Sequence, residues 1–207
     1  AQGKDVSQTF SIQWGKGSGF EQIAKLQGYD KKGKVVDQAE FDAAVKQSGI
    51  IAYRTWSSGM NYTTNKQATA NDFKRSFMND DSVVAAGSGG RVYGSGTYIA
   101  ANSKPVPGKN PLPSNANAAL KDSQMYGSGK SATAQITLDP SAKIADYHKL
   151  SAELNALPKK TRLNRFAGDV GIYAAAKGYD AVRAVDAGWG CDYITILNRT
   201  KAIILND

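Results

Sequence analysis

Residues 94–100 read Gly-Ser-Gly-Thr-Tyr-Ile-Ala, a glycine-rich turn that leads into good strand formers. Two distant segments share its character. Tyr53-Arg54-Thr55-Trp56 follows the apolar run at residues 50–52, and Asp192 precedes the apolar run at residues 193–197. Each segment predicts a short buried strand. We therefore expect three strands that carry, in chain order, an arginine at a strand end, a Gly-x-Gly-x-Tyr turn and a carboxylate at a strand start.

The rest of the chain predicts a mixture of helices and strands. Hydrophobic periodicity predicts helices at residues 20–26, 41–46, 69–78, 149–157 and 166–177, with Gly49 and Gly178 as stop signals. Further strands are expected at residues 83–86, 132–138, 143–147, 181–185 and 202–205. Because helices are expected mainly in the first half and strands in the second, the order favours an α+β fold over a regular βαβ winding.

Length and composition exclude several classes of protein. A chain of 207 residues can bury one sizeable core without disulfides or metal ions. Cys191 and His148 are the only cysteine and histidine, so neither a disulfide framework nor a Cys/His zinc site can form, and we expect no metal. No apolar run is long enough to span a membrane, and no signal peptide is visible.

The net charge of +8 and the pI of about 9.4 favour an anionic partner, because clustered Lys and Arg attract phosphates and acidic surfaces. The densest clusters are Lys31-Lys32-Gly33-Lys34 and Lys159-Lys160-Thr161-Arg162. Solvated loops are the more common explanation of such clusters. A dinucleotide, a nucleic acid or an acidic protein therefore all stay open as partners.

Two phosphate-loop patterns fail on their spacing. Gly129-Lys130-Ser131 ends like a Walker A loop, but Gln124 stands where that motif requires glycine. The glycines between residues 87 and 96 do not form Gly-x-Gly-x-x-Gly between a strand and a helix. The sequence therefore predicts neither a P-loop nor a Rossmann site.

In their order, the three opening segments resemble the nicotinamide site of mono-ADP-ribosyltransferases. In that family an arginine at the end of the first strand holds the phosphate and ribose side of NAD, and Arg54, with Thr55 beside it, takes this place. A planar guanidinium suits the task because it binds phosphate oxygens in a fork and stays charged. The Gly-x-Gly-x-Tyr turn resembles the family's nicotinamide-binding turn, so Gly94, Gly96, Thr97 and Tyr98 are the expected contacts of the ring.

The third segment departs from the family pattern. The family places a glutamate at the start of a strand, with Glu or Gln two residues before it, whereas this chain has Asp192 and Gly190. The resemblance gives Asp192 the stabilisation of the ribosyl cation as nicotinamide leaves. Aspartate is one methylene shorter, and a displacement of about 1 Å can lower a rate about a hundredfold. Trp189 and Gly190 are the expected acceptor contacts in the preceding loop.

The resemblance implies a split β-sandwich of two small sheets with helices around the first sheet, formed by residues 41–207. Residues 1–40 are then an N-terminal extension or the first helices of the same domain. The implied activity is cleavage of NAD and transfer of ADP-ribose to a protein or nucleic acid, catalysed by Arg54, Tyr98 and Asp192. An NAD glycohydrolase and a catalytically weak virion module are the alternatives. The expected location is the cytoplasm of a host or target cell, reached as a phage-delivered protein or a secreted toxin domain.

Overall fold

The computed structural model describes residues 3–13, 19–61, 66–79, 92–103, 116–127, 129–187 and 190–207. The α-helices of this part are α1 (Gly19–Gln27), α2 (Gln38–Ser48), α3 (Ala70–Asn79), α4 (Ala116–Met125), α5 (Tyr147–Ala156), α6 (Lys159–Phe166) and α7 (Val170–Ala176). The strands are β1 (Lys34–Val36), β2 (Ala52–Ser57), β3 (Gly59–Asn61), β4 (Lys66–Ala68), β5 (Thr97–Ala101), β6 (Ser131–Leu138), β7 (Ile144–Asp146), β8 (Ala181–Ala184), β9 (Asp192–Ile196) and β10 (Ala202–Leu205). The predicted α+β class is confirmed.

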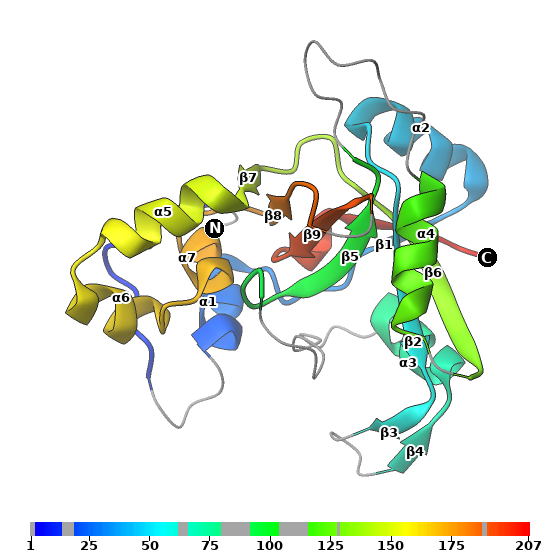
Figure 1. Ribbon diagram of the computed structural model, residues 1–207, viewed down its shortest axis with the longest axis horizontal. Coiled ribbons are helices and arrows are strands. Elements are labelled where there is room, and N and C mark those ends of the chain that lie inside the picture. Colours follow the sequence, from blue (N-terminus) through cyan, green and yellow to red (C-terminus); the bar gives the residue numbers. More distant parts are fainter. Residues whose placement is uncertain are drawn as a thin grey trace.

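Eight of these strands form one sheet in the order β1-β10-β6-β2-β5-β9-β8-β7. The pairs β1/β10 and β7/β8 are parallel, and the other neighbours are antiparallel. Strands β3 and β4 form a separate two-stranded ribbon that extends away from the sheet at the lower right of Figure 1. The described strands form one continuous sheet and a ribbon. This arrangement does not confirm the two-sheet sandwich that the resemblance implies, which stays a prediction.

The register of the sheet separates its side chains into two faces. Ala52, Arg54 and Trp56 lie on the face against which α3 packs, and we call this the α3 face. Tyr53 and Thr55 point the other way, towards α4, and we call that side the α4 face. Since cross-strand partners share a face, this division fixes the side on which each candidate residue of β5 and β9 lies.

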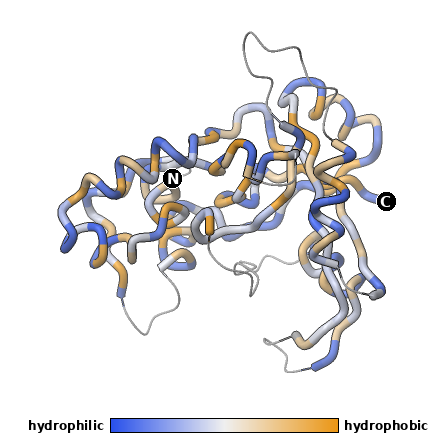
Figure 2. The backbone as a smooth tube through the Cα atoms, in the orientation of Figure 1, coloured by the Kyte–Doolittle hydropathy of each residue, from blue (hydrophilic) through white to orange (hydrophobic). Residues whose placement is uncertain are grey.

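Helices cover the two faces unequally along the sheet. α2 packs against β6 and β10, and α4 packs against β2 and β5, both on the α4 face. At the other end, α1, α5, α6 and α7 gather beside β7 and β8, as Figure 1 shows. In Figure 2 hydrophilic and hydrophobic residues alternate along these helices, as expected where one side of a helix is buried.

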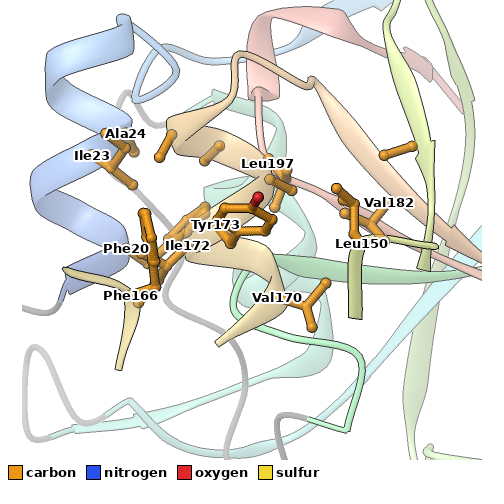
Figure 3. Close-up of a cluster of buried hydrophobic side chains, with 14 of the residues drawn as sticks. Phe20, Ile23, Ala24, Leu150, Phe166, Val170, Ile172, Tyr173, Val182 and Leu197 are labelled. Atoms are coloured by element: carbon orange, nitrogen blue, oxygen red, sulfur yellow. The ribbon is translucent and has the colours of Figure 1, made fainter. Parts of the chain in front are cut away.

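The helices at this end share a hydrophobic core. Phe20 and Ile23 of α1 face Phe166, Ile172 and Tyr173 of α6 and α7, with further buried side chains of α5 and the sheet beside them (Figure 3). Burying one such large apolar side chain contributes about 1.5–3 kcal/mol. Strand β1 pairs with β10 as well. Residues from the first forty therefore contribute to both the sheet and this core.

Two predicted elements differ from the structure. The helix expected at residues 166–177 starts only at Val170, because Ala167 and Gly168 take positive φ values of 51° and 69° and Asp169 caps α7 by accepting from Ile172 N–H. Phe166 instead ends α6, a helix that was not predicted. The strand expected at residues 143–147 ends at Asp146, whose carboxylate caps α5 through Lys149 N–H. The strand expected at residues 83–86 lies outside the described residues.

The expected division into early helices and late strands is also wrong. α5, α6 and α7 follow residue 146, and β1 to β5 precede residue 102. The central strands were predicted correctly, however, and their arrangement decides where the candidate residues lie.

Candidate functional site

The three candidate strands are consecutive neighbours in the sheet, in the order β2-β5-β9. Ala52 pairs with Ala101, and Ala101 pairs with Asp192. The fold therefore brings together segments that lie about 40 and 90 residues apart in the sequence.

Arg54 lies on the α3 face of β2 and is partly buried. Its Nη1 donates to the carbonyl oxygen of Tyr98 at 2.7 Å, and its guanidinium lies 5.4 Å from the centre of the Trp56 ring. Nε is buried and has no hydrogen-bond partner within the described part of the chain. Burial, together with the positive charge of Arg199, lowers the pKa of Arg54 to about 10. An arginine with a depressed pKa and an unused donor is suited to receive an anion.

Thr55 lies on the opposite face of the same strand. Its hydroxyl is 2.8 Å from the hydroxyl of Ser123 on α4 and 2.8 Å from that of Thr133 on β6. This network joins α4 to two strands. The structure therefore separates the side chain of Thr55 from the guanidinium of Arg54, although the two residues are adjacent in the sequence.

The glycines of the Gly-x-Gly-x-Tyr turn allow the chain to approach itself closely. Gly94 has φ +92°, and a Cβ there would lie 2.2 Å from the nitrogen of Gly171 at the start of α7. Gly96 has φ +142°, and a Cβ there would lie 2.7 Å from the carbonyl oxygen of Ile196. Both positions need glycine for conformation and for space. The turn is packed against α7 and the end of β9.

Asp169 holds this turn from the side of α7. Its Oδ1 accepts from Ser95 N–H at 2.9 Å and from Ile172 N–H at 3.0 Å, and its Oδ2 accepts from the Ser95 hydroxyl at 2.8 Å. One carboxylate thus caps a helix and fixes the middle of the turn. Sequence analysis missed Asp169. The signal was there, because Gly168-Asp169 before an apolar run is a helix-start pattern.

Tyr98 points to the α4 face, whereas the buried Thr97 shares the α3 face with Arg54. The Tyr98 hydroxyl donates to the carbonyl of Gly94 at 2.5 Å and accepts from Tyr93 N–H at 2.9 Å. Burial raises the pKa of Tyr98 to about 12. Its hydroxyl therefore closes the turn from inside, and Arg54 meets the main chain of Tyr98 and not its ring.

Tyr93 links Tyr98 to further tyrosines on this face. It stacks on Tyr193 at a centroid distance of 5.7 Å and meets Tyr147 edge-on at 5.2 Å. The Tyr193 hydroxyl donates to the buried carboxylate of Asp122. Burial and this hydrogen bond raise the pKa of Tyr193. The sequence did not indicate the cluster because its tyrosines come from three separate segments.

Asp192 begins β9 on the α3 face and is fully buried. Its Oδ2 accepts from Arg183 Nε at 2.7 Å, and its Oδ1 accepts from Asp186 N–H at 3.0 Å. Arg183 also donates to the carbonyl of Asn102 at 2.6 Å. The carboxylate is thus held by the neighbouring strand β8. Arg183, which sequence analysis missed, is a lone charge within the apolar run at residues 181–185, and such a charge predicts a partner.

Arg54 and Asp192 share a face without touching. Asp192 lies level with Ala52, two strands away, and Arg54 is two residues beyond Ala52 along β2. At about 4.8 Å per strand and 3.3 Å per residue, the Cα atoms of Arg54 and Asp192 are about 12 Å apart. The buried side chains of Ile99 and Ile194 belong to the core on this face. The described residues therefore place the arginine and the carboxylate on one face, and the tyrosine ring on the other.

The predicted acceptor loop is described in part. Trp189 lies outside the described residues. Gly190 has φ +77°, and its carbonyl oxygen accepts from the Ser103 hydroxyl at 3.4 Å. The neighbouring Cys191 is buried, and burial raises the pKa of its thiol to about 12. A positive φ next to a buried cysteine fixes the chain where it enters β9.

Among the described residues, no group of three or more His, Cys, Asp or Glu side chains could hold a metal ion. In the same part of the chain, no helix combines the length and hydropathy that a membrane span requires. No protein-family model, no curated protein and no solved structure matches the chain.

Proposed function

We propose that this chain is a mono-ADP-ribosyltransferase, which cleaves the bond between nicotinamide and ribose in NAD and transfers ADP-ribose to a macromolecular acceptor. The observation that carries the proposal is the neighbouring placement of β2, β5 and β9, with Arg54 donating to the main chain of Tyr98. Three segments chosen from the sequence for one chemistry are adjacent in space. A chance match of three short patterns has no reason to produce that arrangement.

The electrostatics of Arg54 support its part in binding NAD. Its Nη1 is fixed by the Tyr98 carbonyl, and its buried Nε has no partner among the described residues, so a phosphate that reached Arg54 would meet a positioned charge. A charged guanidinium in a partly buried place interacts more strongly with an anion than one in water. In the reaction, the C1′–N bond breaks with its electron pair going to nicotinamide, and the acceptor then attacks C1′ and loses a proton.

Asp192 supplies negative charge at the start of β9. Its Oδ2 accepts a hydrogen bond from Arg183 Nε at 2.7 Å. Both oxygens accept hydrogen bonds, one from Arg183 and one from Asp186 N–H. In the proposal, Asp192 therefore positions β9 and adds negative charge to the electrostatic field of the site. Direct contact with the ribosyl cation would require the carboxylate to leave Arg183.

The test is nicotinamide release from NAD by the purified chain, compared with Arg54→Gln and Asp192→Asn. Arg75→Gln is the matched control, because Arg75 is an exposed arginine on α3 with one long ion pair. We expect Arg54→Gln to lower the release about tenfold or more, equal to about 1.4 kcal/mol, and Arg75→Gln to leave it unchanged. Absence of both release and NAD binding at millimolar concentration would refute the proposal.

The fate of ADP-ribose separates the transferase from the glycohydrolase. Labelled ADP-ribose attached to a protein or nucleic acid identifies a transferase, and free ADP-ribose alone identifies hydrolysis. The basic chain favours an acceptor with acidic groups. Thermal unfolding of each variant must accompany these assays, since Asp192 is a buried ion-pair partner.

One observation favours a second candidate, a structural or binding module of a virion without turnover. Asp192 is fully buried and bound to Arg183, and core side chains occupy the same face as Arg54 and Asp192. A module of this kind would bind no NAD. Saturable NAD binding that is lost in Arg54→Gln would therefore exclude it.

A further inference from the structure

A cavity of about 330 Å³ opens between α5, the turn that joins α6 to α7, and residues 92–94. α5 contributes Tyr147, Ser151 and Asn155, which share one side of the helix because they are four residues apart. Gly168 and Asp169 form the opposite wall. Small-molecule sites range over about 300–1,000 Å³, so this cavity has room for one small ligand.

Hydrogen bonds fix two walls of the cavity. Asp169 holds Ser95 through both the N–H and the hydroxyl of that residue, which positions Gly94 at the edge. On the other side, the Tyr147 hydroxyl donates to the carbonyl of Val92 at 3.2 Å. The cavity is thus preformed, and a ligand that enters it does not have to order these segments.

The lining combines groups that recognise a sugar with a ring that can pack on a base. Asp169 supplies carboxylate oxygens, Asn155 an amide and Ser151 a hydroxyl, and these groups accept from and donate to sugar hydroxyls. Tyr147 supplies an aromatic ring, which His148 meets edge-on at 5.4 Å. A small number of polar groups beside an aromatic ring is typical of a site that binds a small polar ligand.

Positive charge lies at the rim. Arg162 Nη1 donates to Asn155 Oδ1 at 2.8 Å, which brings a permanent cation to the edge of the cavity. The exposed Lys159 and Lys160 begin the same helix, α6. A ligand with a terminal phosphate would have its sugar in the cavity and its charge near Arg162.

We propose that this cavity binds a ribonucleoside monophosphate, with the ribose hydroxyls at Asp169 and Asn155, the base against Tyr147 and the phosphate at Arg162. Ribose with a 5′-phosphate belongs to each half of NAD and also to a free nucleotide. The inference does not rest on NAD cleavage. It concerns the α4 side of the sheet, where the ring of Tyr98 lies, and not the α3 face with Arg54.

The test is calorimetric titration of the full chain with adenosine monophosphate and with nicotinamide mononucleotide. Ser151→Leu extends a larger side chain into the cavity, and Asn155→Leu replaces the amide by an apolar group of the same shape. Ala152→Leu is the matched control, since Ala152 is exposed on the same helix outside the lining. We expect at least one nucleotide to bind, a loss of affinity of about tenfold or more in the two cavity variants, and no change in Ala152→Leu. Arg162→Gln should weaken the nucleotide but not the nucleoside.

Absence of binding of both nucleotides at millimolar concentration, or equal affinity in wild type and Asn155→Leu, would overturn the proposal. Preference for nicotinamide mononucleotide assigns the cavity to the nicotinamide half of NAD, and preference for adenosine monophosphate assigns it to an adenylate. Nicotinamide release is measured on the same samples. Nucleotide binding without release leaves this inference standing while the proposed function fails, and release without nucleotide binding gives the opposite result.

Discussion

Asp192 accepts a hydrogen bond from Arg183 Nε at 2.7 Å, and this ion pair joins the first residue of β9 to the neighbouring strand β8. The Asp192 side chain is 0% exposed and that of Arg183 is 11% exposed. Charges removed from water in this way depend on each other, because either one alone would keep its desolvation penalty without the attraction. The residue that was chosen for catalysis is therefore also a structural residue.

We predict that Asp192→Ala lowers the free energy of unfolding by about 3–5 kcal/mol, because Arg183 is left buried without its counter-charge. The double variant Asp192→Leu/Arg183→Met should recover most of this loss. Lys34→Ala is the control, since it breaks an exposed pair with Glu40 and should cost less than about 1 kcal/mol. Urea denaturation measures all three. An Asp192→Ala loss no larger than that of Lys34→Ala would show that the pair is not structural.

The contact between the Gly-x-Gly-x-Tyr turn and α7 gives a second prediction. Gly171 lies inside a helix, where alanine normally stabilises by up to about 1 kcal/mol, but a Cβ there would lie 2.0 Å from the carbonyl oxygen of Ser95. We therefore expect Gly171→Ala to destabilise the chain by several kcal/mol, about as overpacking of a core does or more.

Gly49→Ala provides the control for Gly171→Ala. Gly49 has φ +68° and nothing within 4 Å of an added Cβ. The substitution should therefore lower the free energy of unfolding only by the backbone strain, about 1–2 kcal/mol. Thermal unfolding of the two variants measures the difference. If Gly171→Ala were as stable as wild type, the turn would not be packed on α7.

The raised pKa of Tyr98 predicts a loss of stability in alkali. The folded pKa is about 12 because of burial, whereas the ordinary value is 10.0. Between these values the unfolded state loses its proton first, so the stabilisation is complete below about pH 10 and disappears as the pH rises through about 12. We expect the free energy of unfolding of wild type to fall over this range, and to fall less in Tyr98→Phe.

Tyr53→Phe is the comparison for that titration, because burial also raises the pKa of Tyr53, which lies on the same face. The ultraviolet absorbance of tyrosinate, followed with pH, reports when each hydroxyl ionises. An identical alkaline slope in wild type and Tyr98→Phe would contradict the assignment of this titration to Tyr98.

Much of the sheet could be predicted from sequence because its central strands have strong local signals. Residues 132–138 alternate, and residues 193–197 form an apolar run, so β6 and β9 were expected within a residue or so. The break at Ala167 was missed because it depends on left-handed φ values at Ala167 and Gly168. Alanine has no preference for that conformation, so the helix was expected to start at Phe166 and not at Val170.

The candidate site was predictable only as far as its strands. A pattern of residue types located Arg54, Tyr98 and Asp192, but a one-residue step in a strand reverses the face, and strand register is set by pairing across the sheet. Sequence alone therefore could not show that the ring of Tyr98 and the side chain of Arg54 lie on opposite faces of the sheet. The helix-capping role of Asp169 was readable from the sequence, but its contact with Ser95, 74 residues earlier, was not, because that contact depends on how α7 meets the turn.

Arg54 and Arg183 should respond oppositely to removal of their charge. Both lie in strands on the α3 face, but Arg183 has a carboxylate partner and Arg54 has a carbonyl and the repulsive charge of Arg199. Since the pKa of Arg54 falls to about 10, its charge opposes folding at every pH below about 10, and this penalty is relieved as the pH rises towards 12.5.

We predict that Arg54→Gln keeps a thermal midpoint equal to or above that of wild type, because the lost hydrogen bond to Tyr98, worth about 1 kcal/mol, is offset by removal of the desolvated charge. Arg183→Gln should lower the midpoint by about 6–20 °C, as expected for a loss of about 3–5 kcal/mol in a chain of this size. Scanning calorimetry at neutral pH distinguishes the two. A charge that is unfavourable for folding is retained where it binds a ligand. A stable Arg54→Gln variant that no longer binds NAD would therefore support Arg54 as a binding residue. Equal destabilisation by Arg54→Gln and Arg183→Gln would instead make Arg54 a structural residue.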